Sequence, residues 1–394
     1  MRQRLVFLAI FAAAECAMSA GCSGCGDSGK ASDAGTDGGT DSDADADSDA
    51  DSDADTDSEE NDCNDSGDLL SWQPLPEGYD CGPGCRQITF ESISSGAAWY
   101  TDGRYVSCTG DAGKKAIVVD TQNSCWTYLL HPKYEVDHWQ WSSTHGGHTL
   151  FAAENYQDIL AKLSLVDFDL EEGTACLIHE MEEDVQAEGR RYQYVSLGEE
   201  YVAFEMQHFG AAYNHQVFLI DLSTEQISSI SNNELIVHGT RTDNDYVVWT
   251  DATDQTDPDI YAHRISTSTT WNLTDHPSGQ FVPQLDGTRV VWTDLRNGDG
   301  EYWGSYENAD IYMYDFADDS LTRVTEGEWV KYMPDISGDR IVWQDYRSCE
   351  QPNNAQDFSQ VDIWMHDLAT GEDHQITNLD GSESQPLIAG GKVF

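Results

Sequence analysis

Pro283-Gln-Leu-Asp-Gly-Thr-Arg-Val-Val-Trp292-Thr-Asp294-Leu-Arg296 is the stretch that decides the fold, because the chain repeats it. The same pattern returns as Pro334-Asp-Ile-Ser-Gly-Asp-Arg-Ile-Val-Trp343-Gln-Asp345-Tyr-Arg347. After a long insert, each copy continues with a second motif, Asp310-Ile-Tyr-Met-Tyr-Asp315 in one and Asp362-Ile-Trp-Met-His-Asp367 in the other. Matching motifs in matching order indicate an internal repeat, which is typical of solenoids, propellers and other arrays.

The repeat extends along most of the chain. Taking the turn residue of each unit as its start places seven units 43 to 52 residues apart, at Gly103, Gly147, Gly198, Asn244, Gly287, Gly338 and Gly390. This period suits a four-stranded propeller blade. Within a unit, Asp-Gly or Gly-Asp predicts a tight turn, Val-Val-Trp predicts a fully apolar strand, and Asp-Ile-Tyr predicts an alternating strand. Helical periodicity is confined to residues 155–163.

We therefore predict an all-β protein, a β-propeller of four-stranded blades that occupies residues 69–394. The prediction is seven units with the last one incomplete, as if the sequence were truncated at its C-terminus. A six-bladed ring is the alternative. Residues 386–394 are expected to form the first strand of the last unit and the opening of its second strand.

These landmarks resemble the TolB-type propeller repeat, with its Asp-Gly turn, apolar strand, Asp-x-Arg, Ile-Tyr and terminal Leu-Thr. The resemblance covers about residues 85 to 394 and is strongest after Asp243. It implies a fold rather than an activity, because the family includes protein-binding scaffolds and the noncatalytic domains of peptidases. The Asp-x-Arg landmark is present in the two units quoted above, whereas Asp251 lacks the arginine.

The amino terminus has the pattern of an export signal, which we assign to residues 1–21. Arg2 and Arg4 precede a ten-residue apolar stretch, which is too short to span about 30 Å of hydrocarbon as a helix. The ending Ala20-Gly21-Cys22 resembles the lipobox of bacterial lipoproteins, which implies that Cys22 is acylated after cleavage. Ordinary secretion is the alternative.

Residues 22–68 are predicted to be an acidic disordered spacer behind the lipidated cysteine. Between Asp27 and Asp68 there are 17 acidic residues against one lysine, and no aromatic or branched aliphatic residue. Such a segment has nothing to bury that would offset its ordering entropy. Calcium is a possible ligand of the Asp-rich run, although the run lacks the turn glycine and the later bidentate acid of a calcium loop.

The overall charge limits the range of partners. The chain carries 72 acidic and 20 basic residues, a formal net charge of −52. Binding to nucleic acid depends on clustered Lys and Arg that displace counterions from phosphates. We therefore expect no nucleic-acid partner, and contact with the membrane through the lipid anchor only.

Ten cysteines fit export to an oxidising compartment, where disulfide bonds form. Their pairing cannot be deduced from the sequence. Cys63, Cys81 and Cys85 precede the repeats, and we expect them to link the end of the spacer to the domain through disulfide bonds. Zinc is the alternative for Cys81 and Cys85, but no second pair of ligands lies nearby.

Two long connections between second and third strands form the candidate binding face. They run from Asp294 to Asp310 and from Asp345 to Asp362, and we expect them to meet because they leave equivalent strands of adjacent units. Long loops are often functional, and aromatic side chains on them suit contacts with sugars or proteins. Alternatively, the aromatic residues pack over the adjacent blade and the arginines pair with repeat carboxylates. The predicted face comprises Tyr302, Trp303, Tyr306, Phe358, Asp294, Arg296, Asp299, Asp345 and Arg347.

Catalytic motifs are missing from the sequence: there is no Gly-x-Ser-x-Gly elbow, no His-Glu-x-x-His pair and no glycine-rich phosphate loop. A metal at His138, His145 and His148, or calcium among the acids of the binding face, stays open, and no other cofactor is expected. We predict a non-catalytic binding or scaffold protein of the cell envelope that contacts protein or glycan. It would be lipid-anchored at the outer membrane or cell surface. The alternatives are a carbohydrate-active enzyme (a lyase or glycosidase) and an accessory subunit of an envelope transport system.

Overall fold

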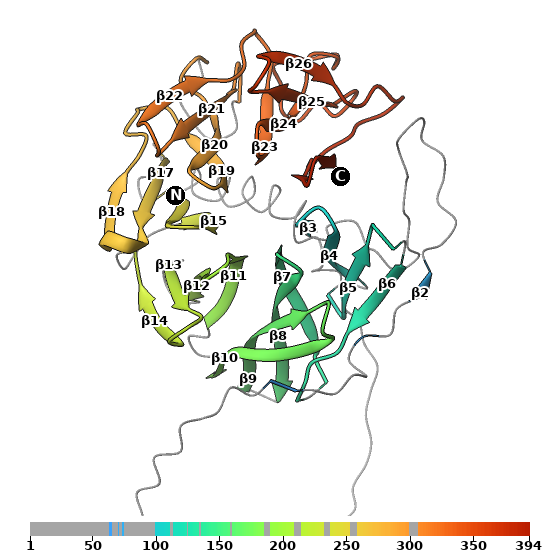
Figure 1. The fold of residues 1–394 in the computed structure, drawn as a ribbon. Coiled ribbons are helices and arrows are strands. Elements are labelled where there is room, and N and C mark those ends of the chain that lie inside the picture. Colours follow the sequence, from blue (N-terminus) through green and yellow to red (C-terminus); the bar gives the residue numbers. More distant parts are fainter. Residues whose placement is uncertain are drawn as a thin grey trace, which may run out of the picture.

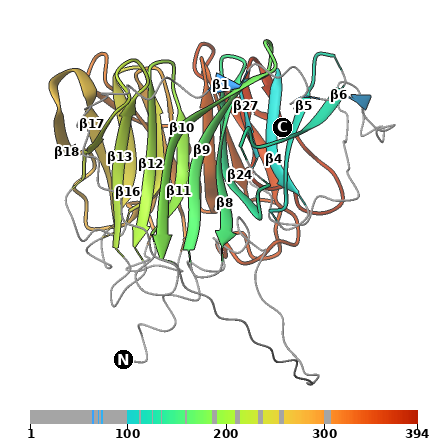
Figure 2. The ribbon, with the colours of Figure 1, turned by 90° about the horizontal axis from the view of Figure 1, so that it is seen from below.

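The repeated units fold into antiparallel sheets that are arranged around a central axis like the blades of a propeller (Figure 1). The structure is a computed structural model that describes residues 63–64, 70, 73–74, 99–110, 113–123, 125–133, 135–157, 160–184, 190–208, 214–231, 237–252, 258–298 and 306–394. Seen from the side, the strands run between two faces at which the connecting turns gather (Figure 2). In the described residues the only helical element is one 3-10 turn, η1 (Ile265–Thr267), so the all-β prediction is confirmed.

Each complete blade has four strands in chain order, with the first strand nearest the axis. Blade 1 contains β3 (Trp99–Thr101), β4 (Tyr105–Gly110), β5 (Lys115–Asp120) and β6 (Cys125–Leu129); blade 2 contains β7 (His138–His145), β8 (His148–Gln157), β9 (Leu160–Asp169) and β10 (Thr174–Asp184); blade 3 contains β11 (Arg190–Leu197), β12 (Tyr201–His208), β13 (Asn214–Asp221) and β14 (Gln226–Ser229). Blade 4 contains β15 (Val237–Asp243), β16 (Tyr246–Asp251), β17 (Asp259–Arg264) and β18 (Thr269–Asn272); blade 5 contains β19 (Gln280–Asp286), β20 (Arg289–Asp294), β21 (Asp310–Asp315) and β22 (Ser320–Arg323); blade 6 contains β23 (Lys331–Ser337), β24 (Arg340–Asp345), β25 (Asp362–Asp367) and β26 (Glu372–Gln375).

Two short strands from the N-terminal side extend the outer edges of blades 1 and 2. Strand β2 (Gln73–Pro74) pairs with β6, and β1 (Cys63–Asn64) pairs with β10. In the second pairing, Cys63 lies directly opposite Cys176. The predicted signal, Cys22 and the Asp-rich spacer up to residue 62 lie outside the described residues.

The second strands of blades 4 to 6 carry a run of apolar residues that packs between neighbouring blades. Trp249, Trp292 and Trp343 occupy equivalent positions in β16, β20 and β24, and none is more than 1% exposed. Each tryptophan belongs to an apolar cluster that it shares with the preceding blade. The predicted register of these strands is therefore confirmed, and the apolar layers between blades form the core.

A β-bulge interrupts the first strand of blades 2 to 6 at the same level. The residue just after the last regular pair has a positive φ angle in every case: Trp141 (27°), Tyr194 (45°), Gly239 (72°), Val282 (56°) and Met333 (51°). Gln385 has the same conformation, with φ 56°, shortly before strand β27 (Ile388–Ala389). Bulges bend a strand and increase its twist, which suits strands that surround a narrow axis.

First strands are also tied to one another by hydrogen bonds from main chain to side chain. The Leu197 N–H donates to Ser143 Oγ of the preceding blade at 2.9 Å. In the same way, the Ile388 N–H donates to Asp335 Oδ2 at 2.7 Å. Strand β27 therefore occupies the next first-strand position after blade 6.

Strands β27 and β28 (Lys392–Val393) form a two-stranded sheet that joins blade 6 to blade 1. A Cβ atom at Gly103 would lie 2.8 Å from the Gly390 nitrogen, so the two backbones can approach only without a side chain there. Lys392 Nζ donates to the Gly103 carbonyl at 2.9 Å. In the part of the chain that the structure describes, the ring thus consists of six blades and this hairpin, which is the predicted opening of the last unit.

The helical tendency of residues 155–163 is not realised. Outside residues 158–159, this stretch belongs to the long hairpin of β8 and β9. Ala161, Leu163 and Leu165 pack in a cluster with residues of blade 3, whereas Val166 and Phe168 pack with residues of blade 1. Alternate residues therefore face opposite sides of the sheet, as in a strand. No helix among the described residues is long and apolar enough to cross a membrane.

Candidate functional site

The described residues of the two long loops share an apolar core at one face of the propeller. The loop of residues 295–309 joins β20 to β21, and the loop of residues 346–361 joins β24 to β25. Side chains from both loops pack together with residues of β19 and the segment before β23 in one buried cluster: Phe281, Leu295, Ala309, Val330, Tyr346, Cys349 and Val361. The loops therefore meet, as their equivalent positions in adjacent blades predicted.

Each loop begins with a buried aspartate that holds an arginine. Arg296 donates to both carboxylate oxygens of Asp294, at 2.8 and 2.7 Å. Arg347 does the same with Asp345, at 2.7 Å for both hydrogen bonds. Both aspartates are fully buried. The Asp-x-Arg motif therefore forms an ion pair where the strand turns into the loop, and we call this ion pair the Asp-x-Arg corner. This agrees with the alternative that the arginines pair with carboxylates of the repeat.

The two aromatic residues of the predicted face that the structure describes differ in exposure, since Tyr306 is half-buried and Phe358 is exposed. Tyr306 packs against Tyr332 and Phe281, with ring centroids 5.1 and 6.0 Å apart. Phe358 is 57% exposed, and its ring lies 6.1 Å from that of Tyr346. Asp299, Tyr302 and Trp303 lie outside the described residues.

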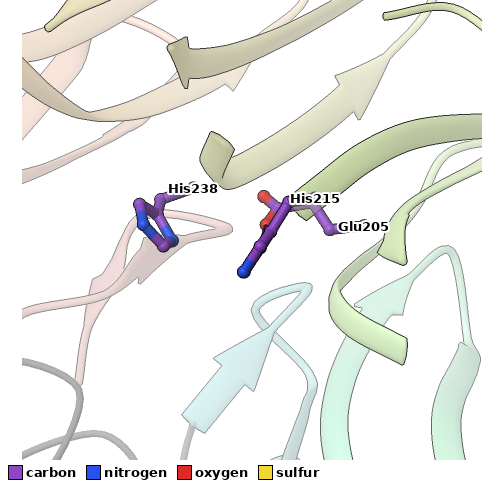
Figure 3. A group of neighbouring side chains, drawn as sticks. All are labelled: Glu205, His215 and His238. Atoms are coloured by element: carbon purple, nitrogen blue, oxygen red, sulfur yellow. Dashed lines mark hydrogen bonds and ion pairs between the residues drawn. The ribbon is translucent and has the colours of Figure 1, made fainter. Parts of the chain in front are cut away.

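A second polar feature lies between blades 3 and 4. Glu205 of β12, His215 of β13 and His238 of β15 converge, with one donor atom of each lying within 4.8 Å of the others (Figure 3). It is the one group of three or more His, Cys, Asp or Glu side chains in the described residues that could hold a metal ion. The group sits where β12 ends and where β13 and β15 begin, which is the same face as the long loops.

The carboxylate of this group is held in a fixed orientation. Glu205 Oε1 accepts hydrogen bonds from the Thr240 N–H at 3.1 Å and from its hydroxyl at 2.8 Å. The other oxygen, Oε2, faces His215 Nδ1 at 3.5 Å. Burial raises the pKa of Glu205, although the hydrogen bonds from His215 and Thr240 oppose this. Burial, together with the neighbouring His215, holds the pKa of His238 well below its usual range.

These three residues belong to no sequence motif. The histidines that the sequence offered as metal ligands, His138, His145 and His148, form no such group. His148 Nδ1 is paired with Asp167 at 2.9 Å, and this hydrogen bond raises its pKa. A signal was nevertheless present: Glu205 stands at the repeat position that is occupied by Thr250, Thr293 and Gln344 in blades 4 to 6.

No protein-family model and no curated protein sequence matches the chain. Among solved structures, it is similar to the β-propeller domain of the Trilobed protease from Pyrococcus furiosus (TM-score 0.52, 11% identity, 75% of this chain and 86% of that one). It is also similar to an oligogalacturonate lyase in complex with manganese (TM-score 0.52, 13% identity, 79% and 86%). TolB from Acinetobacter baumannii is a further neighbour (TM-score 0.40, 16% identity, 75% and 70%). The chain is a β-propeller, and its structural neighbours include TolB proteins, a peptidase domain and a lyase.

Proposed function

We propose that the chain is a binding or scaffold propeller of the cell envelope, which contacts protein or glycan through the face formed by its two long loops. The observation that carries this proposal is the exposure of Phe358 above the shared core of the loops. An exposed aromatic ring on a face whose supporting residues are packed and hydrogen-bonded provides a rigid contact surface, and aromatic residues are enriched among binding hot spots.

The Asp-x-Arg corners support this proposal indirectly. Because Arg296 and Arg347 are each held by two hydrogen bonds, they fix where the loops leave the sheet. Their charges are already compensated by Asp294 and Asp345. We therefore assign recognition to the aromatic residues Phe358 and Trp303, and assign the corners a supporting role.

Trp303→Ala and Phe358→Ala are each expected to weaken partner binding at least tenfold without a change in the unfolding midpoint. Binding is measured on an array of envelope polysaccharides, and by photo-crosslinking from position 358 in envelopes of the producing cell. Leu321→Ala on the outer strand β22 is the matched control, because this side chain is 52% exposed but lies away from the loops. Unchanged binding in both loop variants would contradict the proposal, and a lowered midpoint would favour the packing alternative.

A carbohydrate-active enzyme is the second candidate. Two observations favour it: the similarity to an oligogalacturonate lyase in complex with manganese, and the group of Glu205, His215 and His238 on the loop face. Release of unsaturated products from acidic oligosaccharides by the purified chain would support this function over simple binding.

We also propose that the chain is exported and anchored through a lipid on Cys22, with Cys63 and Cys176 joined by a disulfide bond. Residues directly opposite in an antiparallel pair have Cα atoms about 4.5–5.5 Å apart, within the range that a disulfide spans. Such bonds persist in oxidising compartments. Cys108, Cys125 and Cys349 carry free thiols.

Mass spectrometry of the protein from the membrane fraction is expected to find an acylated N-terminal peptide and, without reduction, a peptide pair that joins Cys63 to Cys176. Cys22→Ala should shift the protein to the soluble envelope fraction while it keeps the disulfide. A soluble wild-type chain with an unmodified N-terminus would exclude the anchor. Reduced Cys63 and Cys176 would exclude the disulfide.

A further inference from the structure

We propose that Glu205, His215 and His238 bind a divalent transition-metal ion that accepts imidazole ligands, such as Zn²⁺, between blades 3 and 4. The site is separate from the two long loops, so this inference does not rest on what the loops bind.

The geometry of the three donors fits an ion of this class. Metal–nitrogen and metal–oxygen bonds of about 2.0–2.2 Å in a tetrahedral arrangement place neighbouring ligand atoms about 3.3–3.6 Å apart. Glu205 Oε2 and His215 Nδ1 are already 3.5 Å apart. One ligand atom of each of the three residues lies within 4.8 Å of the other two. Small rotations of side chains would therefore bring all three donors to bonding distance of one ion.

The surroundings of the carboxylate resemble those of a metal ligand. Thr240 binds one oxygen of Glu205 through both its N–H and its hydroxyl, which leaves the other oxygen directed at the two imidazoles. Hydrogen bonds of this kind orient ligand carboxylates in metal sites. The rings of His215 and His238 meet edge to face, with centroids 5.2 Å apart, so they approach the same space without stacking.

The burial of Glu205 is also compatible with a role as a metal ligand. Glu205 has no exposed surface, and an ionised carboxylate in such a place needs strong compensation. A divalent cation bound between Glu205 Oε2 and His215 Nδ1 would compensate the carboxylate charge directly. The main alternative is a hydrogen-bonded pair of Glu205 and His215 without an ion.

The propeller repeat itself does not require these side chains. The position of Glu205 is filled by Thr250, Thr293 and Gln344 in the following blades. The position of His238 is filled by other residues in the other blades: Gln140, Gln193, Phe281 and Tyr332. An acid and a histidine therefore replace neutral residues at this one junction, where His215 completes the group.

The donor set selects the kind of metal. Calcium and magnesium prefer ligand sets made of oxygen atoms, whereas imidazole suits zinc, copper, iron and nickel. Two histidines and one carboxylate leave at least one coordination position open, as in metal sites that accept water or a substrate. The inferred ion would therefore be able to bind a further ligand.

The test measures metal uptake by the purified full chain after chelator treatment and dialysis. Titration calorimetry with Zn²⁺ and with Mn²⁺ is compared among the wild type, Glu205→Gln and His238→Gln. Glutamine occupies both equivalent positions elsewhere in the ring, at Gln344 and Gln193, so these substitutions are compatible with the blade. His148→Gln is the control, because this histidine lies outside the group.

We expect one tight site in the wild type and in His148→Gln, and at least tenfold weaker binding in Glu205→Gln and His238→Gln. The Asp-rich spacer attracts cations weakly in all four proteins, so the difference between variants isolates the site. Zn²⁺ should raise the unfolding midpoint of the wild type and of His148→Gln, but not that of Glu205→Gln or His238→Gln. Equal affinity in the wild type and both ligand variants, or no tight site in the wild type, would overturn the proposal. If Glu205→Gln does not fold, His238→Gln alone decides.

Discussion

Trp292→Ala is expected to lower the free energy of unfolding by about 3–5 kcal/mol, because it opens a cavity in the apolar layer between blades 4 and 5. Trp292 is fully buried and shares a cluster with Val248 and Ile260 of the preceding blade. Its indole N–H donates to Asp294 Oδ2 at 2.8 Å, so the substitution also removes a hydrogen bond from the Asp-x-Arg corner. Equilibrium unfolding in denaturant measures the change.

Trp292→Phe is the informative companion variant, since it keeps most of the apolar contact but loses the N–H donor. We expect a smaller loss than with alanine. Trp249→Ala and Trp343→Ala should resemble Trp292→Ala, because all three residues have the same place in the repeat. A loss below about 1 kcal/mol for each of the three alanine variants would contradict the role of these side chains as the core between blades.

Asp310→Asn is also expected to lower the free energy of unfolding by about 3–5 kcal/mol, because it leaves the buried charge of Lys331 without its carboxylate partner. Asp310 and Lys331 are both fully buried, and Lys331 Nζ lies 3.0 Å from Asp310 Oδ1. The carboxylate also accepts hydrogen bonds from Asn297 at 2.9 Å and from Arg323 at 2.7 Å. It thus links blade 5 to the first residue of β23 in blade 6.

The pH dependence of this variant distinguishes a buried charge from lost packing. Burial lowers the pKa of Lys331 in the folded state, although Asp310 opposes the shift, and without the aspartate we expect it to fall further. Between that lowered pKa and the ordinary value near 10.4, the unfolded chain binds more protons, so stability rises with pH. The destabilisation by Asp310→Asn should therefore shrink as the pH is raised toward about 10. Adding Lys331→Met should restore part of the lost stability at neutral pH, and a further loss there would contradict the assignment.

Much of the fold was predictable because a propeller is encoded by short patterns that recur. The Val-Val-Trp strands predicted the buried tryptophans, and the Asp-Gly and Gly-Asp turns marked the units. The helical tendency of residues 155–163 was misleading, because the long hairpin of β8 and β9 packs alternate residues against a neighbouring blade. The short sequence pattern is compatible with both a helix and a strand, and tertiary packing decides between them.

The candidate site was less predictable, for a physical reason. Glu205, His215 and His238 come from three strands of two blades, so their proximity depends on how the blades pack and not on any spacing in the chain. Only an alignment of the repeats reveals Glu205 and His238, as an acid and a histidine at positions that hold uncharged residues in other blades. By contrast, Arg296 and Arg347 lie two residues from their aspartates, and such local pairs can be anticipated from the sequence.

The bulge in the first strands has a consequence for how the repeat diverged. Its left-handed residue is a glycine only at Gly239, whereas a tryptophan, a tyrosine, a valine and a methionine hold the same backbone shape in the other blades. Such a conformation costs a non-glycine residue of order 1–3 kcal/mol, and it is least natural for a β-branched residue such as Val282. The repeat units therefore retain a backbone conformation that lowers stability, although the residue at this position differs from blade to blade. The units of this ring therefore share the backbone conformation of the bulge more closely than they share the amino acid that adopts it.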